Sequence, residues 1–300
     1  MLTDGSERRN RWRDEGLGQL EQGFISLHED LTRPDLSAED REIRRRRNSP
    51  PIVTVIGITG IPLVHPGDHL ASIIVDAARR QKTPIAEGDA VVVTHTVVSL
   101  SEGLIVDLEG IEPSDFAKRF GVEHGKDPRL VELVLRNSKR IVRMKGGILI
   151  AETKHGFVCA NAGVDVSNVS GGSMAVTLPQ DPDASANSIR RGIKDITGLD
   201  VALLVSDTHG RPLRRGQVNL AIGVSGINPL YDRRGEFDLH GRALQVKNIA
   251  VADEICGAAE LVIGQAAEGI PAAIVRGYRY HRGRSSARHL IRKEEEDLFI

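Results

Sequence analysis

The sequence predicts an α/β fold, in which helices alternate with short apolar strands. Runs rich in β-branched residues recur along the chain, for example at residues 52–56 and 90–98, and segments with the apolar spacing of helices separate them. Hydrophobic residues make up 40% of the 300 positions, which is enough to bury a substantial core. This alternation favours a sheet that has helices packed against it and polar loops at the strand ends.

The first fifty residues differ from the rest of the chain in charge density. They hold 21 of the 81 charged residues, and they end in four arginines followed shortly by Pro50, which together with Pro51 excludes a continuing helix. Because this segment has little apolar surface to offset the entropy of ordering, we expect residues 1–50 to form a charged, disordered leader. A solvated linker and a start codon placed too far upstream both fit it. Residues 51–300 are expected to form the α/β domain, as one unit or as two subdomains.

The elements expected in this domain each have a sequence signal. Residues 70–78 have the apolar spacing of an amphipathic helix. Asp127 and Pro128 open another helix, because Asp is a favoured cap and Pro fits the first helical position. The other expected elements are strands at 146–151, 157–160, 201–206 and 272–275, and helices at 183–197, ending at Gly198, and at 251–268.

Composition excludes several classes of protein. The 40 basic and 41 acidic residues nearly cancel, which argues against a chain that coats nucleic acid or an anionic membrane. Two cysteines are too few for a disulfide scaffold or a four-cysteine zinc site. No apolar stretch approaches a membrane span or a signal peptide, so a soluble cytoplasmic protein is expected. The Walker-type phosphate loop, the dinucleotide glycine fingerprint, the zincin helix and the nucleophile elbow are also absent.

Two carboxylates follow apolar strands directly. Asp165 comes after the strand expected at 157–160, and Asp207 comes after the strand expected at 201–206. Carboxylates held at strand ends, beside hydroxyls and amides, are hard oxygen ligands suited to Mg²⁺ or Mn²⁺. Each could equally be a helix cap or a turn former. Three arginines just downstream could neutralise phosphate oxygens; they are Arg211, Arg214 and Arg215.

The cysteines and histidines indicate supporting roles. Cys159 and Cys256 lie in apolar runs, where packed thiols are far commoner than nucleophiles. Four histidines have local spacing that fits no zinc motif, so we expect most of them to be surface groups or groups that support other ligands. They are His95, His155, His209 and His240.

A series of short motifs follows in a specific order along the chain. Two of the most distinctive read HGFVCANAGVDVSN at residues 155–168 and SDTHGRP at residues 206–212. The others lie at residues 60–63, 67–68, 178–183, 251–254, 259–265, 268–271 and 294–299. In this order and spacing the chain, from about residue 55 to the C-terminus, resembles the coenzyme F420-0:L-glutamate ligase family.

The resemblance implies a fold of mixed sheets with helices, with residues 51–300 as the catalytic domain of an intertwined homodimer. The implied reaction adds L-glutamate to the lactyl-phosphate side chain of coenzyme F420-0, in F420 biosynthesis. It consumes GTP and passes through an acyl phosphate. The implied ions are two divalent cations, Mg²⁺ or Mn²⁺, with K⁺ as a further candidate. Neither nucleic acid nor a membrane is an implied partner.

Matched position by position, the resemblance also implies roles for individual residues. Asp165 and Asp207 match the ligands of a first metal ion and are the catalytic candidates, while Thr208 and Gln265 match the ligands of a second. The matched nucleotide contacts are Ile61, Pro62, Leu63, Val64, His95, Thr96, Asn168, Ile263, Gly264, Gln265, Ala266, Ala267, Glu268, Gly269 and Ile270.

One position departs from the family pattern. Leu100 stands where the family has a lysine that contacts the nucleotide. Losing a charge-assisted contact costs about 1.5–3 kcal/mol unless another group, such as His95 or one of the three arginines, replaces it. Two alternatives therefore stay open: a related amide ligase that uses a different carboxylate or amine, and a noncatalytic protein that binds a nucleotide or cofactor.

Overall fold

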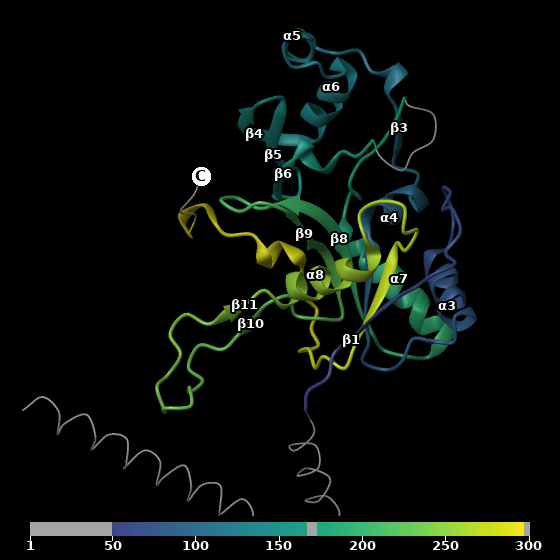
Figure 1. Cartoon of the computed structure of the whole chain (residues 1–300), viewed down its shortest axis with the longest axis vertical. Helices are drawn as coiled ribbons and strands as arrows, with labels where there is room; N and C mark the ends of the chain where they lie inside the picture. The colour runs from purple at the N-terminus through teal and green to yellow at the C-terminus, as the bar shows by residue number, and fades with distance from the viewer. Residues whose placement is uncertain (1–49, 167–172, 297–300) are drawn as a thin grey trace, which may run out of the picture. The chain divides into compact units, whose positions relative to one another are not determined.

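A mixed β-sheet organises the computed structural model, which describes residues 50–166 and 173–296 (Figure 1). In spatial order its strands are β1 (Thr54–Gly57), β12 (Ala272–Arg276), β2 (Ala90–Thr94), β8 (Ala202–Gly210) and β9 (Gln217–Ser225). Strands β2 and β8 run parallel, and the other neighbours run antiparallel. The predicted combination of mixed sheets and helices is confirmed. The parallel pairing matters for function, because it brings the carboxyl end of β2 beside Ser206 and Asp207 of β8.

Helices pack against this sheet. Helix α3 (Leu70–Arg80) lies beside α7 (Pro182–Thr197), which also packs on β8 and β9 (Figure 1). Helix α8 (Val251–Ile263) packs on β9, β12 and β1. The core between these elements is apolar; its most buried members include Val91, Val92, Leu203, Leu204 and Ile274. Burying these β-branched and leucine side chains is the main stabilising contribution to the sheet.

The predicted helix ends are set by capping residues. At α7 the Asp181 side chain accepts a hydrogen bond from the backbone N–H of Ala184, and Gly198 ends the helix with φ of 75°. At α6 (Pro128–Asn137) the Asp127 side chain accepts from the N–H of Arg129, with Pro128 at the first position. Both patterns satisfy backbone groups that a helix end leaves unpaired.

Residues 105–176 include a second, smaller apolar cluster, formed by side chains such as Leu108, Val134 and Leu149. Its elements are β3 (Ile105–Asp107), η2 (Leu108–Gly110), α5 (Asp115–His124), α6, β4 (Ser138–Lys145), β5 (Ile148–Thr153), β6 (Val158–Ala160), η3 (Asn161–Gly163) and β7 (Met174–Val176). Strand β3 pairs with β7, and β4, β5 and β6 form an antiparallel sheet. Strand β6 also contacts β8, and this contact connects the cluster to the central sheet.

The segment between β9 and α8 forms a hairpin arm. Its base is formed by β10 (Tyr231–Asp232) and β11 (Asn248–Ile249), and Figure 1 shows it extending away from the central sheet. Phe237, Leu239 and Val246 on this arm are exposed. The chain after β12 contains η4 (Ala287–Leu290) and η5 (Glu294–Glu296).

Three predicted elements have different bounds in the structure. The strand expected at 90–98 ends at Thr94, and residues 95–101 form α4 (His95–Ser101), because a short apolar run suits a buried helix as well as a strand. The helix expected at 251–268 ends at Ile263, since Gly264 adopts φ of 75° and ψ of −177°, which no helix continues. The loop expected from Asp207 onward is strand as far as Gly210.

The bounds of the other predicted strands shift by one or two residues. No helix within residues 50–166 and 173–296 is both long enough and apolar enough to cross a membrane. The predicted leader, residues 1–50, lies outside the described residues except for its last residue.

Candidate functional site

A cavity of about 510 Å³ lies where β2 ends, beside Ser206 and Asp207 of β8. Its wall combines five separate parts of the chain besides these strands: residues 61–64, α4, residues 160–165, the start of β9 and the loop after α8. The sequence-predicted residues that line it are Ile61, Pro62, Leu63, Val64, His95, Thr96, Asp165, Asp207, Thr208, Ile263, Gly264, Gln265, Ala266, Glu268, Gly269 and Ile270. Ala267 belongs to the same loop but does not line the cavity, and Asn168 lies outside the described residues.

Parallel pairing explains how two of these residues meet. Thr94 at the end of β2 pairs with Ser206 of β8, so the next residues, His95 and Asp207, emerge side by side. The Nε2 atom of His95 lies 3.2 Å from Oδ1 of Asp207. The carboxyl edge of parallel strands is where α/β proteins commonly bind ligands.

Asp207 is held between two histidines. His209 lies two residues along β8, on the same face, and its Nε2 is 3.1 Å from Oδ2 of Asp207. Burial raises the pKa of Asp207, but the charge and hydrogen bonds of His95 and His209 outweigh burial and hold that pKa well below its ordinary range. Burial lowers the pKa of His95, yet the charges of Asp207 and Asp165, with the Asp207 hydrogen bond, raise it above its usual value. Both shifts favour an ionised carboxylate facing an imidazolium.

Asp165 reaches the same cavity from the second cluster of strands. Its backbone pairs with Val176 in both directions, at 2.7 and 2.9 Å, which fixes the position of the residue. Its charge is one of those that raise the pKa of His95, so the two carboxylates act on one imidazole.

Thr208 faces the other side of β8, as strand alternation requires. Its Oγ1 donates to Oδ1 of Asn219 on β9, at 2.7 Å. Gln265, from the loop after α8, lies against the same hydroxyl: its Nε2 is 3.0 Å and its Oε1 is 3.2 Å from Thr208 Oγ1. Gly264 makes this turn possible, because a Cβ there would lie 2.2 Å from the carboxyl carbon of Glu268.

These donors suit divalent cations of the magnesium type. Asp165 and Asp207 offer carboxylate oxygens on one side of β8, and Thr208 and Gln265 offer neutral oxygens on the other. Ligand oxygens bound at right angles to a Mg²⁺-to-Ca²⁺-sized ion are about 3.0–3.4 Å apart, and the 3.2 Å between Thr208 Oγ1 and Gln265 Oε1 fits. The residues that would hold two cations are therefore Asp165 with Asp207, and Thr208 with Gln265.

Cys159 is the one soft donor near this group within the described residues. Its Sγ, a carboxylate oxygen of Asp207 and a ring nitrogen of His209 all lie within 4.8 Å of one another. Burial, together with the negative charge of Asp207, raises the pKa of the Cys159 thiol to about 12. A thiol of this kind is protonated at neutral pH, which agrees with the predicted packing role. Cys256 is also buried, on α8.

The three predicted phosphate-binding arginines are not at the cavity. Arg214 and Arg215 are exposed and Arg211 is half-buried in the turn between β8 and β9, and none lines the cavity. The guanidinium of Arg211 donates instead to the backbone carbonyls of Arg215 and Gly216. They lie away from the site because β8 continues past Asp207 to Gly210. The turn that holds the arginines therefore begins four residues after residue 206, where the strand was predicted to end.

The other two histidines are also outside the site. His155 lies within hydrogen-bond distance of the Gln180 carbonyl oxygen, and His240 is exposed on the arm. Neither lines the cavity, whereas His95 and His209 both contact Asp207. The expected division into surface and supporting histidines agrees with these positions.

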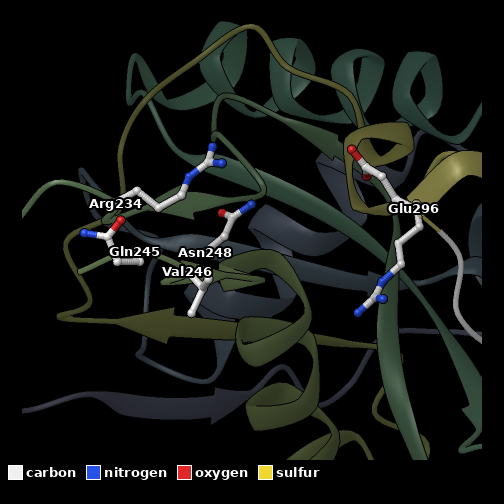
Figure 2. A pocket seen from close by; sticks show the side chains of 6 residues that line it. Arg234, Gln245, Val246, Asn248 and Glu296 are labelled. Carbon is white, nitrogen blue, oxygen red and sulfur yellow. The ribbon is translucent and has the colours of Figure 1, made fainter. Parts of the chain in front are cut away.

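A second cavity, of about 470 Å³, lies between the hairpin arm and the C-terminal segment. Figure 2 shows Arg234, Gln245, Val246 and Asn248 on one side and Glu296 on the other. Arg234 is already paired with Asp232. None of the sequence-predicted site residues lines this second cavity, so the first one is the candidate site.

Several residues of the site were not predicted. Ser206 is buried, lines the cavity and has no hydrogen-bond partner for its Oγ among the described residues, and the same is true of Nδ1 of His95. Asn219 and Gln217 line the cavity from β9, a strand that was not predicted. The alternation of polar and apolar residues from 217 to 220 was a signal for that strand.

Leu100 also lines the cavity, from α4, and packs partly against the main core. The residue that departs from the family pattern thus gives the cavity wall an apolar patch where that pattern has a charge.

Comparison with known proteins shows the family of the chain. A protein-family model described as F420-0:Gamma-glutamyl ligase matches residues 59–277. The chain belongs to this family. A coenzyme F420:L-glutamate ligase of Methanothermobacter thermautotrophicus is 47% identical over 249 residues, covering 82% of this chain and 98% of that protein.

Two further relatives have the same name. The ligase of Methanopyrus kandleri is 46% identical over 81% of this chain and 96% of its own length. The ligase of Methanocaldococcus jannaschii is 47% identical over 72% and 86%. The chain is therefore an enzyme of the F420-0:gamma-glutamyl ligase family, and the matched region includes the whole cavity wall.

Proposed function

We propose that this enzyme forms an amide bond between L-glutamate and coenzyme F420-0, using GTP and two divalent cations. The names of the three relatives support these substrates. The observation that best supports the chemistry is the convergence of oxygen donors from three distant segments on one cavity. These donors are Asp165, Asp207 with Thr208, and Gln265.

The proposed reaction has two chemical steps. The γ-phosphoryl group of GTP passes to a carboxylate oxygen of the acceptor, which gives GDP and an acyl phosphate. The amine of glutamate then attacks the acyl carbon; the amide bond forms, the carbon–oxygen bond to phosphate breaks, and the amine loses a proton. Bound Mg²⁺ or Mn²⁺ would neutralise charge on the transferring phosphoryl group, which with positioning is the main source of catalysis in such transfers.

The side chains of the cavity have separate parts in this scheme. Asp165 and Asp207 hold one cation, and Thr208 and Gln265 hold the other. His95 and His209 keep Asp207 ionised and fix the direction of its carboxylate, since each binds a different carboxylate oxygen. The loop after α8 would contact the nucleotide.

Mass spectrometry tests this proposal directly. The purified enzyme is incubated with coenzyme F420-0, glutamate and Mn²⁺, with GTP in one sample and ATP in another. A glutamylated product that depends on GTP and Mn²⁺ is expected. Absence of that product, with folded protein, would refute the proposed function. The number of added glutamates is read from the same spectrum.

Leu100 favours one alternative acceptor or donor. Because an apolar side chain stands in the cavity wall, a related amide ligase with a different carboxylate or amine is the second candidate. GTP turnover stimulated by another carboxylate, and not by coenzyme F420-0, would identify it.

The homodimer and the K⁺ ion stay predictions. A mass in solution of twice the 32.6 kDa of the chain would establish the former.

A further inference from the structure

Glu260, in the last turn of α8, contacts Gln265, a ligand of the candidate second cation position, without lining the cavity. Its side chain is half-buried. One carboxylate oxygen, Oε1, accepts a hydrogen bond from Nε2 of Gln265 at 2.7 Å. The other, Oε2, accepts from the backbone N–H of Asn219, also at 2.7 Å. Both oxygens of Glu260 are thus engaged by groups that surround Thr208.

A carboxylate accepts hydrogen bonds and donates none, and this determines how the Gln265 amide must turn. The oxygen and nitrogen of an amide are otherwise hard to tell apart, and hydrogen-bond partners decide between them. Since Glu260 can only accept, the NH₂ group of Gln265 must face it. The carbonyl oxygen Oε1 of Gln265 is then directed toward Thr208 and the cavity.

The hydroxyl of Thr208 has only one proton. Its shorter contact, 2.7 Å, is to Oδ1 of Asn219, and it accepts from Nε2 of Gln265 at 3.0 Å. No proton remains for the 3.2 Å contact between Thr208 Oγ1 and Gln265 Oε1. Two oxygens with lone pairs therefore face each other at the cavity wall, an arrangement that a cation between them would stabilise.

We propose that Glu260 is a positioning residue, which orients the Gln265 amide so that Gln265 Oε1 and Thr208 Oγ1 together form a divalent-cation site. This inference rests on the proposed function and adds to it a residue that touches neither the cation nor the nucleotide. Groups that orient metal ligands typically change metal affinity by 10- to 100-fold when they are replaced.

Mn²⁺ binding, measured by the electron paramagnetic resonance signal of the unbound ion, tests the proposal without turnover. Glu260→Gln keeps an oxygen that can accept from the Asn219 N–H, but its NH₂ group can donate to Gln265 and let that amide reverse. We expect wild type to bind two Mn²⁺ ions, and Glu260→Gln to bind one of them at least about tenfold more weakly. Glu254→Gln is the matched control, because Glu254 is exposed on the same helix, and it should bind as wild type does.

Exchanging the two side chains gives a sharper test. In Glu260→Gln with Gln265→Glu, the amide at 260 donates to the carboxylate at 265, and an oxygen again faces Thr208. We expect the exchanged pair to recover Mn²⁺ affinity that Glu260→Gln loses. Equal Mn²⁺ binding by wild type and Glu260→Gln would overturn the proposal. It would also be overturned if the exchanged pair has a thermal midpoint that shows it is folded and still does not recover Mn²⁺ binding.

The same titration separates this inference from the proposed function. If wild type binds no Mn²⁺, the metal requirement of the proposed function fails, and the inference fails with it. If wild type binds two ions and Glu260→Gln binds them equally well, only the inference fails. In turnover assays, Glu260→Gln should need more Mn²⁺ for half-maximal rate but approach the wild-type kcat at saturation.

Discussion

Replacing Asp207 by Asn tests whether the charge of this side chain, and not its shape, supports catalysis. The buried carboxylate lies 3.2 Å from Nε2 of His95 and 3.1 Å from Nε2 of His209, and it accepts from the N–H of Thr208 at 2.7 Å. An Asn of the same size has one acceptor oxygen, so it cannot accept from both His95 and His209, and the contact on its nitrogen side is lost unless a neutral imidazole accepts there. A charge-assisted hydrogen bond is worth about 1.5–3 kcal/mol.

The expected effects on stability and on activity differ in size. Much of the lost hydrogen bonding is offset because a buried charge is removed, so we expect a net cost of about 1 kcal/mol, or about 2–4 °C in Tm. Activity loses a cation ligand and its charge, for which a fall in kcat/KM of about 10²–10³-fold is expected, equivalent to about 2.7–4 kcal/mol.

Two measurements on Asp207→Asn separate these effects: kcat/KM for coenzyme F420-0 with Mn²⁺ and GTP, and the thermal midpoint. Asp253→Asn is the matched control, because Asp253 is a partly buried carboxylate that accepts from the N–H of Ala221 and does not line the cavity. It should keep activity within about threefold, the range expected of a side chain outside the site. Near-wild-type activity of Asp207→Asn would refute the reasoning, and a drop in Tm far beyond that expected would assign lost activity to unfolding.

Three further predictions concern the surroundings of the site. Gly264→Ala should weaken Mn²⁺ binding at least about tenfold, because φ is 75° there and a Cβ would meet the Glu268 carboxyl. Alanine at all three arginines of residues 211–215 should change kcat/KM less than about threefold, since none lines the cavity. Hydrogen bonds from Lys139 and Arg140 lower the pKa of Glu152. This carboxylate therefore stabilises the fold at pH values above its unfolded pKa, and the stabilisation is lost as the pH falls through its folded pKa. Glu152→Gln should therefore lower Tm by about 1–2 °C near pH 7 and converge with wild type near about pH 3.

Each of these three predictions has a contradicting outcome. Unchanged Mn²⁺ binding by Gly264→Ala would show that the turn tolerates a side chain. A large loss of activity in the arginine variant would mean that this turn reaches a bound substrate. A Glu152→Gln difference that grows toward acid pH would have the opposite sign to the one derived.

Local signals were enough to predict most helices. Asp127 and Gly198 act through hydrogen bonds or backbone angles within a few residues of their own positions, so the sequence contains what is needed to recognise them. Asp181, the residue that caps α7, was not predicted, and the helix was expected to begin at 183. Residues 95–98 were assigned to a strand wrongly, because their choice of helix depends partly on packing against β8, which is distant in sequence. Strand β9 was missed for a related reason: its pairing with β8 supplies most of its stability.

The carboxylates of the site were predictable, but their surroundings were not. Asp207 could be identified because it follows a buried apolar run, whereas its contact with His95 depends on the parallel pairing of β2 with β8. The arginine prediction failed on geometry. Each strand residue adds about 3.3 Å, so the four residues from Asp207 to Gly210 move Arg211 about 13 Å beyond the expected strand end.

The position of one helix end explains why a role for Glu260 could not be predicted from the sequence. In a helix that continued to residue 268, Glu260 and Gln265 would be five residues apart, about 140° around the helix axis, and their side chains would diverge. The helix ends at Ile263, and the turn at Gly264 brings the Gln265 amide back to within 2.7 Å of the Glu260 carboxylate. The role of Glu260 depends on this contact with Gln265. The contact forms only because the helix ends at Ile263, before Gln265. A glycine whose dihedral angles no other residue adopts easily is thus what converts a helix-surface carboxylate into a group that orients a cation ligand.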